Sequence, residues 1–429
     1  MNLLTLIQEK TARVAVIGLG YVGVPVALNA AEAGFDVTGI DVQQSRVDEL
    51  AAGVSALAGV TNDEVAAGTS SGRFRATTSF ASLAESDVIV ICVPTPLKDE
   101  LPDMSHIEQA GHKVAEHLRP NQLVILESTT YPGTTEELLF GILESSGLKA
   151  GLEFLMGFSP ERIDPGNPTY RLRNLPKIVG GIDEPSTEAM EAFYGSFIDK
   201  IVPVSSPKTA EMAKLLENTY RHVNIALVNE IAILCHDLGI DVWEVIDAAA
   251  TKPFGFEPFY PGPGWGGHCI PVDPAYLSWR VRQMGATARF VDLAREFNQK
   301  MPAYVVQRMG EALNEHGKSL KSSRILVLGV TYKADVADLR ESPAIEIVER
   351  ARKSGAEVTF HDPFEKLIPL KQGSLDRIEL DEQNVAAADL VLLHTAHASY
   401  DLPWLAEHAR LILDTRNAFH GISGTVVKL

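Results

Sequence analysis

A glycine-rich turn near the start of the chain constrains its fold more than any other feature. The sequence Gly18-Leu19-Gly20-Tyr21-Val22-Gly23 follows the apolar run 13–17 and precedes an alanine-rich segment that ends before Gly34. A second apolar run then ends at Asp41. Three glycines at this spacing, between a strand and a helix, are typical of a βαβ unit that receives a dinucleotide pyrophosphate at the helix N-terminus. The segment therefore predicts a doubly wound α/β domain.

Asp41 indicates which dinucleotide this turn receives. It lies 18 residues beyond Gly23, where a carboxylate accepts hydrogen bonds from a ribose 2′-hydroxyl and repels a 2′-phosphate. Arg46 lies five residues after Asp41. A cation at this position can bind the 2′-phosphate of NADP, but an arginine can instead stack on the adenine ring of NAD. We therefore expect NAD.

The apolar pattern of the chain divides it into three parts. Strand-like runs at 88–93, 123–127, 153–158 and 177–179 alternate in part with helical segments, as in a parallel sheet. Helical periodicity then covers about 209–238, 242–250, 275–284 and 290–316, with a Pro- and Gly-dense stretch at 252–274.

Near residue 322 the strand–turn–helix–strand pattern of the first 41 residues recurs. A strand at 324–329 runs into a glycine turn, a helix covers 343–353, and a strand at 357–361 ends at Asp362, before two further strands at 389–394 and 410–414. We expect two Rossmann-like doubly wound parallel-sheet domains, at residues 1–205 and 319–429, joined by a central helical domain at 206–318.

Composition excludes several classes of function. With 38 basic and 56 acidic residues the net charge is −18, so the chain lacks the basic footprint of a protein that binds nucleic acid or an anionic membrane. No apolar run approaches the ~18 residues of a membrane span, and the N-terminus does not read as a secretory signal. Three cysteines fit a reducing compartment and provide no zinc ligand set. We expect a cytoplasmic protein without a metal.

Hydroxyl side chains follow two of the predicted strands. Thr95 comes after the strand at 88–93, and Thr129 and Thr130 come after the strand at 123–127. Ligands of doubly wound sheets bind outside the carboxyl ends of the strands, so these threonines either face a ligand or cap the loops that carry them.

Three polar residues share one face of the first long helix. Lys214, Asn218 and Arg221 are spaced i, i+4, i+7 in a largely apolar segment. This face is either the solvated side of the helix or the wall of a cleft, where Lys214 can transfer protons and the other two can hold an anion.

The Pro- and Gly-dense stretch contains the third candidate. Cys269 follows Gly266-Gly267-His268 and precedes Asp273, which suits an activated nucleophile on a closely shaped backbone. A structural role for His268 is as consistent with the sequence as a catalytic one. The other two cysteines, Cys92 and Cys235, are expected in the core. In the last domain, Lys333 and Arg340 precede the helix at 343–353. Cations beside a helix N-terminus are typical of a phosphate-binding site, but the same residues also fit a charged loop that faces water.

Together these motifs resemble the UDP-glucose/GDP-mannose dehydrogenase family over nearly the whole chain. The landmarks are Gly18–Gly23, Val93–Pro96, Ser128–Gly133, Ser159–Glu161, Lys214 with Asn218, Gly266–Asp273 and Lys333–Pro343. The UDP-N-acetylhexosamine branch is most similar, because Val272 replaces a lysine, and Pro165 a second glutamate, of UDP-glucose enzymes. The segment 249–256 resembles UDP-N-acetylglucosamine enzymes of O-antigen synthesis. UDP-N-acetylmannosamine enzymes have an arginine in this segment; which residue replaces it here is open, and Lys252 is the candidate.

The resemblance implies an NAD-dependent, four-electron oxidation of the C6 hydroxyl of a UDP-N-acetylhexosamine, UDP-N-acetylglucosamine preferred, to the uronate. Cys269 would carry a thiohemiacetal and then a thioester, and Lys214 would act as acid or base. Asp273, Thr129 and Glu161 would orient or activate the water that hydrolyses the thioester, with Asn218 beside them. UDP-glucose, UDP-N-acetylgalactosamine and UDP-N-acetylmannosamine stay open as substrates.

The resemblance also implies the binding residues and the assembly. Cofactor-binding residues would be Gly18, Gly20, Tyr21, Val22, Gly23, Asp41, Arg46, Thr95, Thr130 and Arg340. Substrate-binding residues would be Arg162, Ile163, Lys214, Asn218, Arg221, Lys252, Tyr260, Gly266, Tyr332 and Lys333. The long central helices would form a homodimer or higher homo-oligomer, and the product would serve surface polysaccharide synthesis.

Two other hypotheses fit parts of the sequence. A β-hydroxyacid or 6-phosphogluconate-type dehydrogenase shares the first domain and the helix lysine, but it needs neither Cys269 nor a third domain. A non-catalytic NAD-binding protein would keep the glycine turn and lose Lys214 or Cys269, and both are present.

Overall fold

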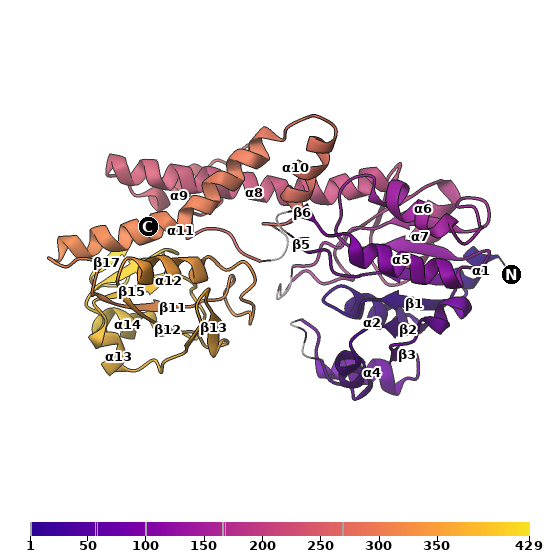
Figure 1. Ribbon diagram of the computed structural model, residues 1–429, viewed down its shortest axis with the longest axis horizontal. Helices are drawn as coiled ribbons and strands as arrows, with labels where there is room; N and C mark the ends of the chain where they lie inside the picture. Colours follow the sequence, from indigo (N-terminus) through magenta and orange to yellow (C-terminus); the bar gives the residue numbers. More distant parts are fainter. Residues whose placement is uncertain are drawn as a thin grey trace. The chain divides into compact units, whose positions relative to one another are not determined.

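The computed structural model (Figure 1) describes the chain except for residues 1, 56, 58, 99, 100, 165, 166, 168, 268 and 269. The predicted nucleophile, Cys269, therefore lies outside the described residues, together with His268 and Pro165. The chain forms two compact units, Met1–Glu217 with Ala275–Ala286 and Asn218–Pro274 with Thr287–Leu429. The predicted domain boundaries at 205/206 and 318/319 stay a prediction.

The first unit is built on an eight-stranded sheet with the order β10-β9-β8-β7-β4-β1-β2-β3. The strands are β1 (Arg13–Ile17), β2 (Asp36–Ile40), β3 (Phe74–Thr77), β4 (Val88–Ile91), β7 (Leu123–Leu126), β8 (Leu155–Phe158), β9 (Lys177–Gly181) and β10 (Ile201–Pro203). Helices include α1 (Leu3–Gln8), α2 (Gly23–Ala33), α3 (Gln44–Ala51), α4 (Asn62–Ser70), α5 (Ser105–His117), α6 (Phe140–Glu144) and α7 (Glu184–Gly195). Smaller elements are the hairpin β5 (Leu97–Lys98) and β6 (Leu101–Pro102), the 3-10 helix η1 (Phe80–Glu85) and the π-helix η2 (Thr134–Leu139).

Alternating side chains of the central strands enter two separate cores, as a doubly wound sheet requires. Val14 and Val16 of β1 pack in one apolar cluster with α2 and α7, whereas Ala15 and Ile17 pack in another with α5. The prediction of a doubly wound α/β domain is thus confirmed.

One strand pair departs from the predicted parallel sheet. β8 and β9 run antiparallel, with Gly157 opposite Gly181 and Phe158 opposite Gly180. A parallel pairing needs a crossover, usually a helix, and the described residues between these two strands contain none. The chain therefore returns in the opposite direction.

Four helices follow the first sheet: α8 (Pro207–Leu238), α9 (Val242–Ala250), α10 (Asp273–Gln283) and α11 (Arg289–Glu315). The predicted ranges agree within a few residues. α8 is continuous over 32 residues and ends before Gly239, which has a φ of +68°, because a glycine tolerates the left-handed backbone that stops a helix.

The last part of the chain forms a five-stranded sheet with the order β12-β11-β15-β16-β17 and parallel pairing throughout. Its strands are β11 (Arg324–Leu328), β12 (Glu357–His361), β15 (Leu390–Leu393), β16 (Ile412–Asp414) and β17 (Val426–Lys428). The helices α12 (Pro343–Lys353), α13 (Glu382–Ala387) and α14 (Leu402–His408) and the hairpin β13 (Leu367–Pro369) and β14 (Ser374–Asp376) complete it. In the described part of the chain no helix combines the length and hydropathy of a membrane span.

Candidate functional site

The three glycines of the first turn have different surroundings. A Cβ on Gly18 would lie 2.5 Å from the carbonyl oxygen of Cys92, and one on Gly23 would collide with the carbonyl of Gly18. Gly20 has no atom within 4 Å of where its Cβ would be. Two glycines are thus required by packing, and the third leaves open space at the start of α2. A pyrophosphate fits this space, because the Val22 side chain does not cap the helix N-terminus.

Asp41 closes the other side of this turn. Its Oδ2 accepts a hydrogen bond from the Leu19 N–H at 2.8 Å, and its Oδ1 accepts one from the Gln43 N–H at 2.9 Å. Each carboxylate oxygen retains a lone pair for a ribose hydroxyl. Arg46 lies beside the turn, with Nη1 3.5 Å from the Leu19 carbonyl, and Tyr21 is exposed.

The structure brings two predicted catalytic residues of the first unit into contact. Lys214 on α8 is buried, and its Nζ lies 2.5 Å from the Oγ1 of Thr129, which follows β7. The neighbouring Thr130 hydroxyl donates instead to the Thr134 hydroxyl. Thr95 is buried after β4, and its carbonyl accepts a hydrogen bond from the Tyr276 hydroxyl at 3.0 Å. An ammonium and a hydroxyl therefore meet beside a strand end of the cofactor-type sheet.

Glu211, one turn before Lys214, was not predicted as a site residue. Its buried carboxylate accepts hydrogen bonds from the Gly133 N–H at 2.5 Å, the Thr135 N–H at 3.0 Å and the Thr135 hydroxyl at 2.7 Å. Burial raises the pKa of Glu211 to about 7, although these hydrogen bonds act to lower it. Glu211 fixes the segment after Thr129 to the helix that carries Lys214. Its i, i+3 spacing from Lys214 was the one signal in the sequence.

Glu161 lies in a buried cluster of charges that the sequence did not indicate. Lys177 Nζ is 3.3 Å from Glu161 Oε2 and 2.9 Å from Glu127 Oε1. Glu127 also accepts hydrogen bonds from the hydroxyl of Tyr194 and the thiol of Cys92. Burial works against the charge of Lys177, but the two carboxylates outweigh it and raise the lysine pKa to about 12. Burial raises the pKa of Glu127.

The other oxygen of Glu161 holds the segment that follows it. Glu161 Oε1 accepts hydrogen bonds from the N–H groups of Arg162 at 2.7 Å and Ile163 at 2.6 Å. Arg162 in turn pairs with Glu217, with Nη2 2.6 Å from Oε1. Within the described residues, Glu161 is thus placed to position two predicted substrate-binding residues.

In the second unit, Asn218 and Asp273 are in direct contact. The Asn218 amide donates to Asp273 Oδ2 at 2.5 Å, and Asp273 begins α10 and is buried. Arg221, one turn further along α8, is exposed. Asp273 is four residues beyond Cys269 in the chain, and Asn218 brings an amide to its carboxylate.

The glycines before Cys269 pack on a predicted substrate-binding residue. A Cβ on Gly266 would lie 2.6 Å from Tyr332 Cβ, and one on Gly267 would lie 2.6 Å from Tyr332 Cε2. The Gly267 N–H also donates to the carbonyl of Arg340 at 3.0 Å. The Arg340 guanidinium is held by Asp338, with Nη2 2.6 Å from Oδ2. The segment 332–340 thus supports the backbone that leads to Cys269.

Two predicted substrate residues lie around α9. The Lys252 ammonium sits 5.0 Å from the ring centroid of the exposed Phe254. Tyr260 stacks on Trp243, and its hydroxyl donates to Asp247 at 3.2 Å. Both residues thus have partners near α9, and none of these partners is a predicted site residue.

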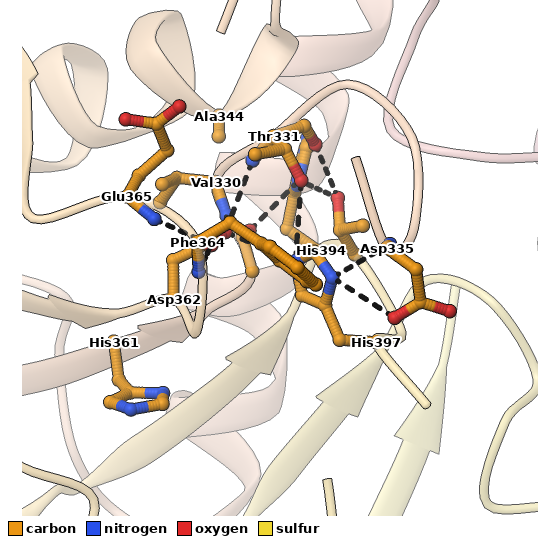
Figure 2. A network of polar contacts seen from close by, with 12 residues as sticks. Val330, Thr331, Asp335, Ala344, His361, Asp362, Phe364, Glu365, His394 and His397 are labelled. Carbon is orange, nitrogen blue, oxygen red and sulfur yellow. Dashed lines mark hydrogen bonds and ion pairs between the residues drawn. The ribbon is translucent and has the colours of Figure 1, made fainter. Parts of the chain in front are cut away.

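The second βαβ unit repeats the carboxylate of the first but encloses it (Figure 2). Asp362, which follows β12, accepts hydrogen bonds from the N–H groups of Val330 at 2.7 Å and Phe364 at 2.8 Å, as Asp41 does from Leu19 and Gln43. The side chains of Asp362 and His397 are both 0% exposed and lie 3.0 Å apart. This carboxylate therefore has no face for a ribose. No group of side chains among the described residues could hold a metal ion.

The first sheet has an open glycine turn followed by the partly exposed Asp41, and Thr129 at the end of another of its strands contacts Lys214. The second βαβ unit, later in the chain, is closed. These features define a dinucleotide-dependent dehydrogenase with one cofactor domain. Models of the UDP-glucose/GDP-mannose dehydrogenase family match the chain in three parts: the NAD-binding domain at 12–198, the central domain at 208–300 and the UDP-binding domain at 326–421. The chain belongs to this family, and its cofactor is NAD.

Similar proteins agree with this assignment. A UDP-N-acetyl-D-mannosamine dehydrogenase of Pyrococcus horikoshii is 36% identical over 94% of this chain and 95% of its own. A UDP-N-acetyl-D-glucosamine 6-dehydrogenase of Pseudomonas aeruginosa is 34% identical over 93% and 98%. A solved UDP-D-ManNAc dehydrogenase from P. horikoshii has a TM-score of 0.88 at 34% identity, covering 97% of this chain and 98% of its own. The match to a UDP-binding domain disfavours the β-hydroxyacid alternative, and nothing supports a non-catalytic protein.

Proposed function

We propose that this nucleotide-sugar dehydrogenase oxidises the C6 hydroxyl of a UDP-N-acetylhexosamine, UDP-N-acetylglucosamine preferred, to the carboxylate. The contact of Lys214 with Thr129 is the observation that supports it most, because it places an ammonium and a hydroxyl together at a strand end of the NAD-binding domain. Relatives named for N-acetylmannosamine, N-acetylglucosamine and N-acetylgalactosaminuronic acid, at 34–36% identity, share an N-acetylhexosamine.

Lys214 transfers the hydroxyl proton in this proposal. Its side chain is buried and its Nζ is held by the Thr129 hydroxyl. As the neutral amine, Lys214 accepts the C6 hydroxyl proton while the hydride leaves C6, and it becomes the ammonium. NAD, when bound, accepts a hydride in each of two oxidations. Gly20 leaves room for the pyrophosphate, and Asp41 accepts from the ribose.

Cys269 carries the sugar between the two oxidations. Its sulfur adds to the C6 aldehyde to form a thiohemiacetal, and oxidation of that adduct leaves a thioester. Water then attacks the thioester carbon, which releases the carboxylate and returns the proton to the thiol. Asp273, held by Asn218, is the base or orienting group for that water, together with Thr129. Glu161 acts through the backbone of Arg162 and Ile163.

The nucleotide half of the substrate binds to the C-terminal domain in this proposal. Tyr332 and Lys333 lie in the loop after β11, and Lys333 supplies a cation for the diphosphate. Arg162, Ile163, Asn218, Arg221, Lys252, Tyr260 and Gly266 complete the proposed substrate set. The segment 249–256 supports N-acetylglucosamine as the preferred sugar, because it is similar to enzymes that act on that sugar.

The test is the number of NADH molecules formed per sugar. We expect two NADH per UDP-N-acetylglucosamine and less product from UDP-glucose, UDP-N-acetylgalactosamine and UDP-N-acetylmannosamine. Two NADH from another of these sugars would move the preference and keep the chemistry. One NADH per sugar would contradict the role of Cys269.

A pair of cysteine variants separates the covalent step from general damage. Cys269→Ser should abolish formation of the uronate while NADH still binds. Cys235→Ser is the matched control, because Cys235 is a buried cysteine on α8 and takes no part in the proposed chemistry. Equal steady-state rates for wild type and Cys269→Ser would rule out the thioester.

The assembly and setting are part of the same proposal. We expect a cytoplasmic homodimer, or a higher homo-oligomer, formed through the central helices and serving surface polysaccharide synthesis. Large apolar side chains are exposed along α8 and α11: Leu227, Leu234, Leu238, Phe290 and Leu293. Light scattering on the purified protein tests the dimer, and a monomer at micromolar concentration would contradict it.

A further inference from the structure

His397 ties together two segments that are far apart in the sequence. Its Nε2 lies 3.0 Å from Asp362 Oδ2 and 3.2 Å from the Thr331 hydroxyl, and its Nδ1 accepts a hydrogen bond from the Asp335 N–H at 3.0 Å (Figure 2). The imidazole thus joins the end of β12 to both ends of the segment 331–335.

The hydrogen bonds determine the tautomer of His397. The N–H groups of Val330, Thr331 and Phe364 point at the Asp362 carboxylate. Burial opposes the charge of Asp362, but hydrogen bonds from His397 and these N–H groups outweigh it and lower its pKa to about 2. Asp362 therefore only accepts, and the Asp335 N–H only donates. His397 carries its proton on Nε2 and keeps Nδ1 as an acceptor.

The segment between these anchor points bears the residues proposed to bind the nucleotide. Thr331 donates its hydroxyl proton to the Lys333 carbonyl at 3.0 Å. Asp335 has a φ of +61°, a left-handed conformation that aspartate adopts more readily than most non-glycine residues. Its N–H is the group that His397 holds, and its Oδ1 accepts from the Ala398 N–H at 3.0 Å.

The same segment supports the approach to Cys269. The Tyr332 ring lies against Gly266 and Gly267 so closely that neither position has room for a Cβ. The rings of Phe364 and Tyr400 pack on the imidazole of His397, with centroids at 5.1 and 5.6 Å, and fix its orientation. A displaced His397 would therefore alter Lys333 on one side and the glycine backbone before Cys269 on the other.

We propose that His397, held by Asp362, is a positioning residue that sets the segment 331–335 for binding the UDP part of the substrate and for supporting the Gly266–Gly267 backbone. The proposal rests on the proposed function, since it takes Tyr332 and Lys333 as substrate-binding residues. It also explains why Asp362 is enclosed where Asp41 is open: the carboxylate of the second βαβ unit holds a protein side chain instead of a ribose.

Two isosteric variants test the two sides of the imidazole. In His397→Gln the amide nitrogen reaches the place of Nε2 and keeps the bond to Asp362, whereas the Asp335 N–H loses its acceptor. In His397→Asn the amide oxygen reaches the place of Nδ1 and still accepts the hydrogen bond from the Asp335 N–H, whereas Asp362 loses the hydrogen bond that Nε2 donates. His408→Gln, on α14 of the same domain, is the matched control, because in the described part of the chain His408 bonds to the Trp404 carbonyl and stacks on the Trp404 ring, away from the segment 331–335.

The measurements are calorimetric titration with UDP and amide exchange of peptides covering 329–341. We expect about a tenfold weaker UDP affinity and about tenfold faster exchange in both His397 variants, the size of one lost buried hydrogen bond. NADH affinity should be unchanged in both, the KM for the UDP-sugar should rise, and His408→Gln should match wild type. A purely structural histidine would lower Tm and leave UDP affinity as it is.

Wild-type UDP affinity in folded His397→Gln and His397→Asn would overturn the proposal. If either variant does not fold, Thr331→Val, which removes only the hydroxyl between His397 and Lys333, provides the test, and unchanged UDP affinity there would also overturn it. UDP binding needs no turnover. A wild-type protein that binds UDP but oxidises no UDP-sugar would therefore contradict the proposed function and leave this inference standing.

Discussion

Asp362 makes in the C-terminal domain the same backbone hydrogen bonds that Asp41 makes in the N-terminal domain, but only Asp362 also receives a histidine. Both follow the second strand of a βαβ unit. Each accepts one hydrogen bond from the N–H of the residue after the turn glycine and one from the N–H of the residue two positions beyond the aspartate itself. The same βαβ arrangement therefore yields an open carboxylate, which we propose receives the ribose of NAD, and a closed carboxylate that holds His397 (Figure 2).

Asp41→Asn tests the open carboxylate. We expect NADH affinity to fall by roughly 10- to 100-fold, about 1.5–3 kcal/mol for a lost hydrogen bond to a charged group, and discrimination against NADPH to weaken. Fluorescence titration with both cofactors measures this. Asp362→Asn is the matched control and should leave NADH affinity at the wild-type value. Equal NADH affinity in all three proteins would contradict the role of Asp41.

Lys214→Met tests the proposed proton transfer. Because methionine keeps much of the length of the lysine but carries no proton, kcat should fall by about 10²- to 10⁴-fold, with NADH affinity within about twofold of wild type. Thr129→Val removes only the hydroxyl that contacts Lys214, so kcat should fall less than in Lys214→Met. Lys208→Ala, on the same helix and paired with the half-buried Glu136 and the exposed Glu137, should leave kcat unchanged. A Lys214→Met enzyme with half the wild-type kcat would exclude Lys214 as the acid or base.

Glu211→Gln tests a buried carboxyl by its effect on stability at different pH. Burial raises the pKa of folded Glu211 to about 7 from an ordinary value of 4.5. The folded state thus holds a proton that the unfolded state releases, so the stabilisation is present below about pH 4.5 and is lost as pH rises through 7. Glutamine does not titrate. The Tm of wild type should therefore fall relative to that of Glu211→Gln between pH 5 and pH 8. Parallel Tm curves over this range would show that Glu211 titrates normally.

Lys177→Met tests the buried charge cluster. Removal of the ammonium leaves Glu127 and Glu161 facing each other without a counter-charge, which we expect to destabilise the fold by about 3–5 kcal/mol. A thermal scan should show Tm lower by several degrees. Lys113→Ala, which removes an exposed ion pair with Glu116, should leave Tm close to the wild-type value, because water screens exposed ion pairs. The double variant Lys177→Met with Glu127→Gln should recover part of the loss, and no recovery would mean that charge is not the cause.

Much of the fold could be read from local patterns. The first turn, the helix α9 at 242–250, the helix α12 at 343–353 and the strand β12 at 357–361 were predicted as the structure has them. Short elements at the end of the chain, such as β17, were missed because three residues carry too little periodicity. The antiparallel pairing of β8 with β9 was missed because strand direction depends on the path of the connecting chain.

Part of the candidate site could also be read from the sequence. Lys214, Thr129, Asn218 and Asp273 were named from motifs, and the structure brings them into two contacting pairs. No sequence spacing relates Glu211 to Gly133, Lys177 to Glu127, or His397 to Asp362. These pairs arise because strand order brings segments together that lie 78, 50 and 35 residues apart.

The sequence by itself determined where the chain turns and which glycines the turn requires, since these depend on backbone sterics and periodicity over a few residues. It also named the candidate side chains for chemistry, which stay predictions. Only the tertiary structure decided which carboxylate stays open and which is enclosed. Asp41 and Asp362 occupy equivalent positions in their βαβ units, and their difference comes from His397, which follows strand β15 and reaches the second turn. Burial and partner choice are properties of the packed sheet, so they decide function where local pattern is the same.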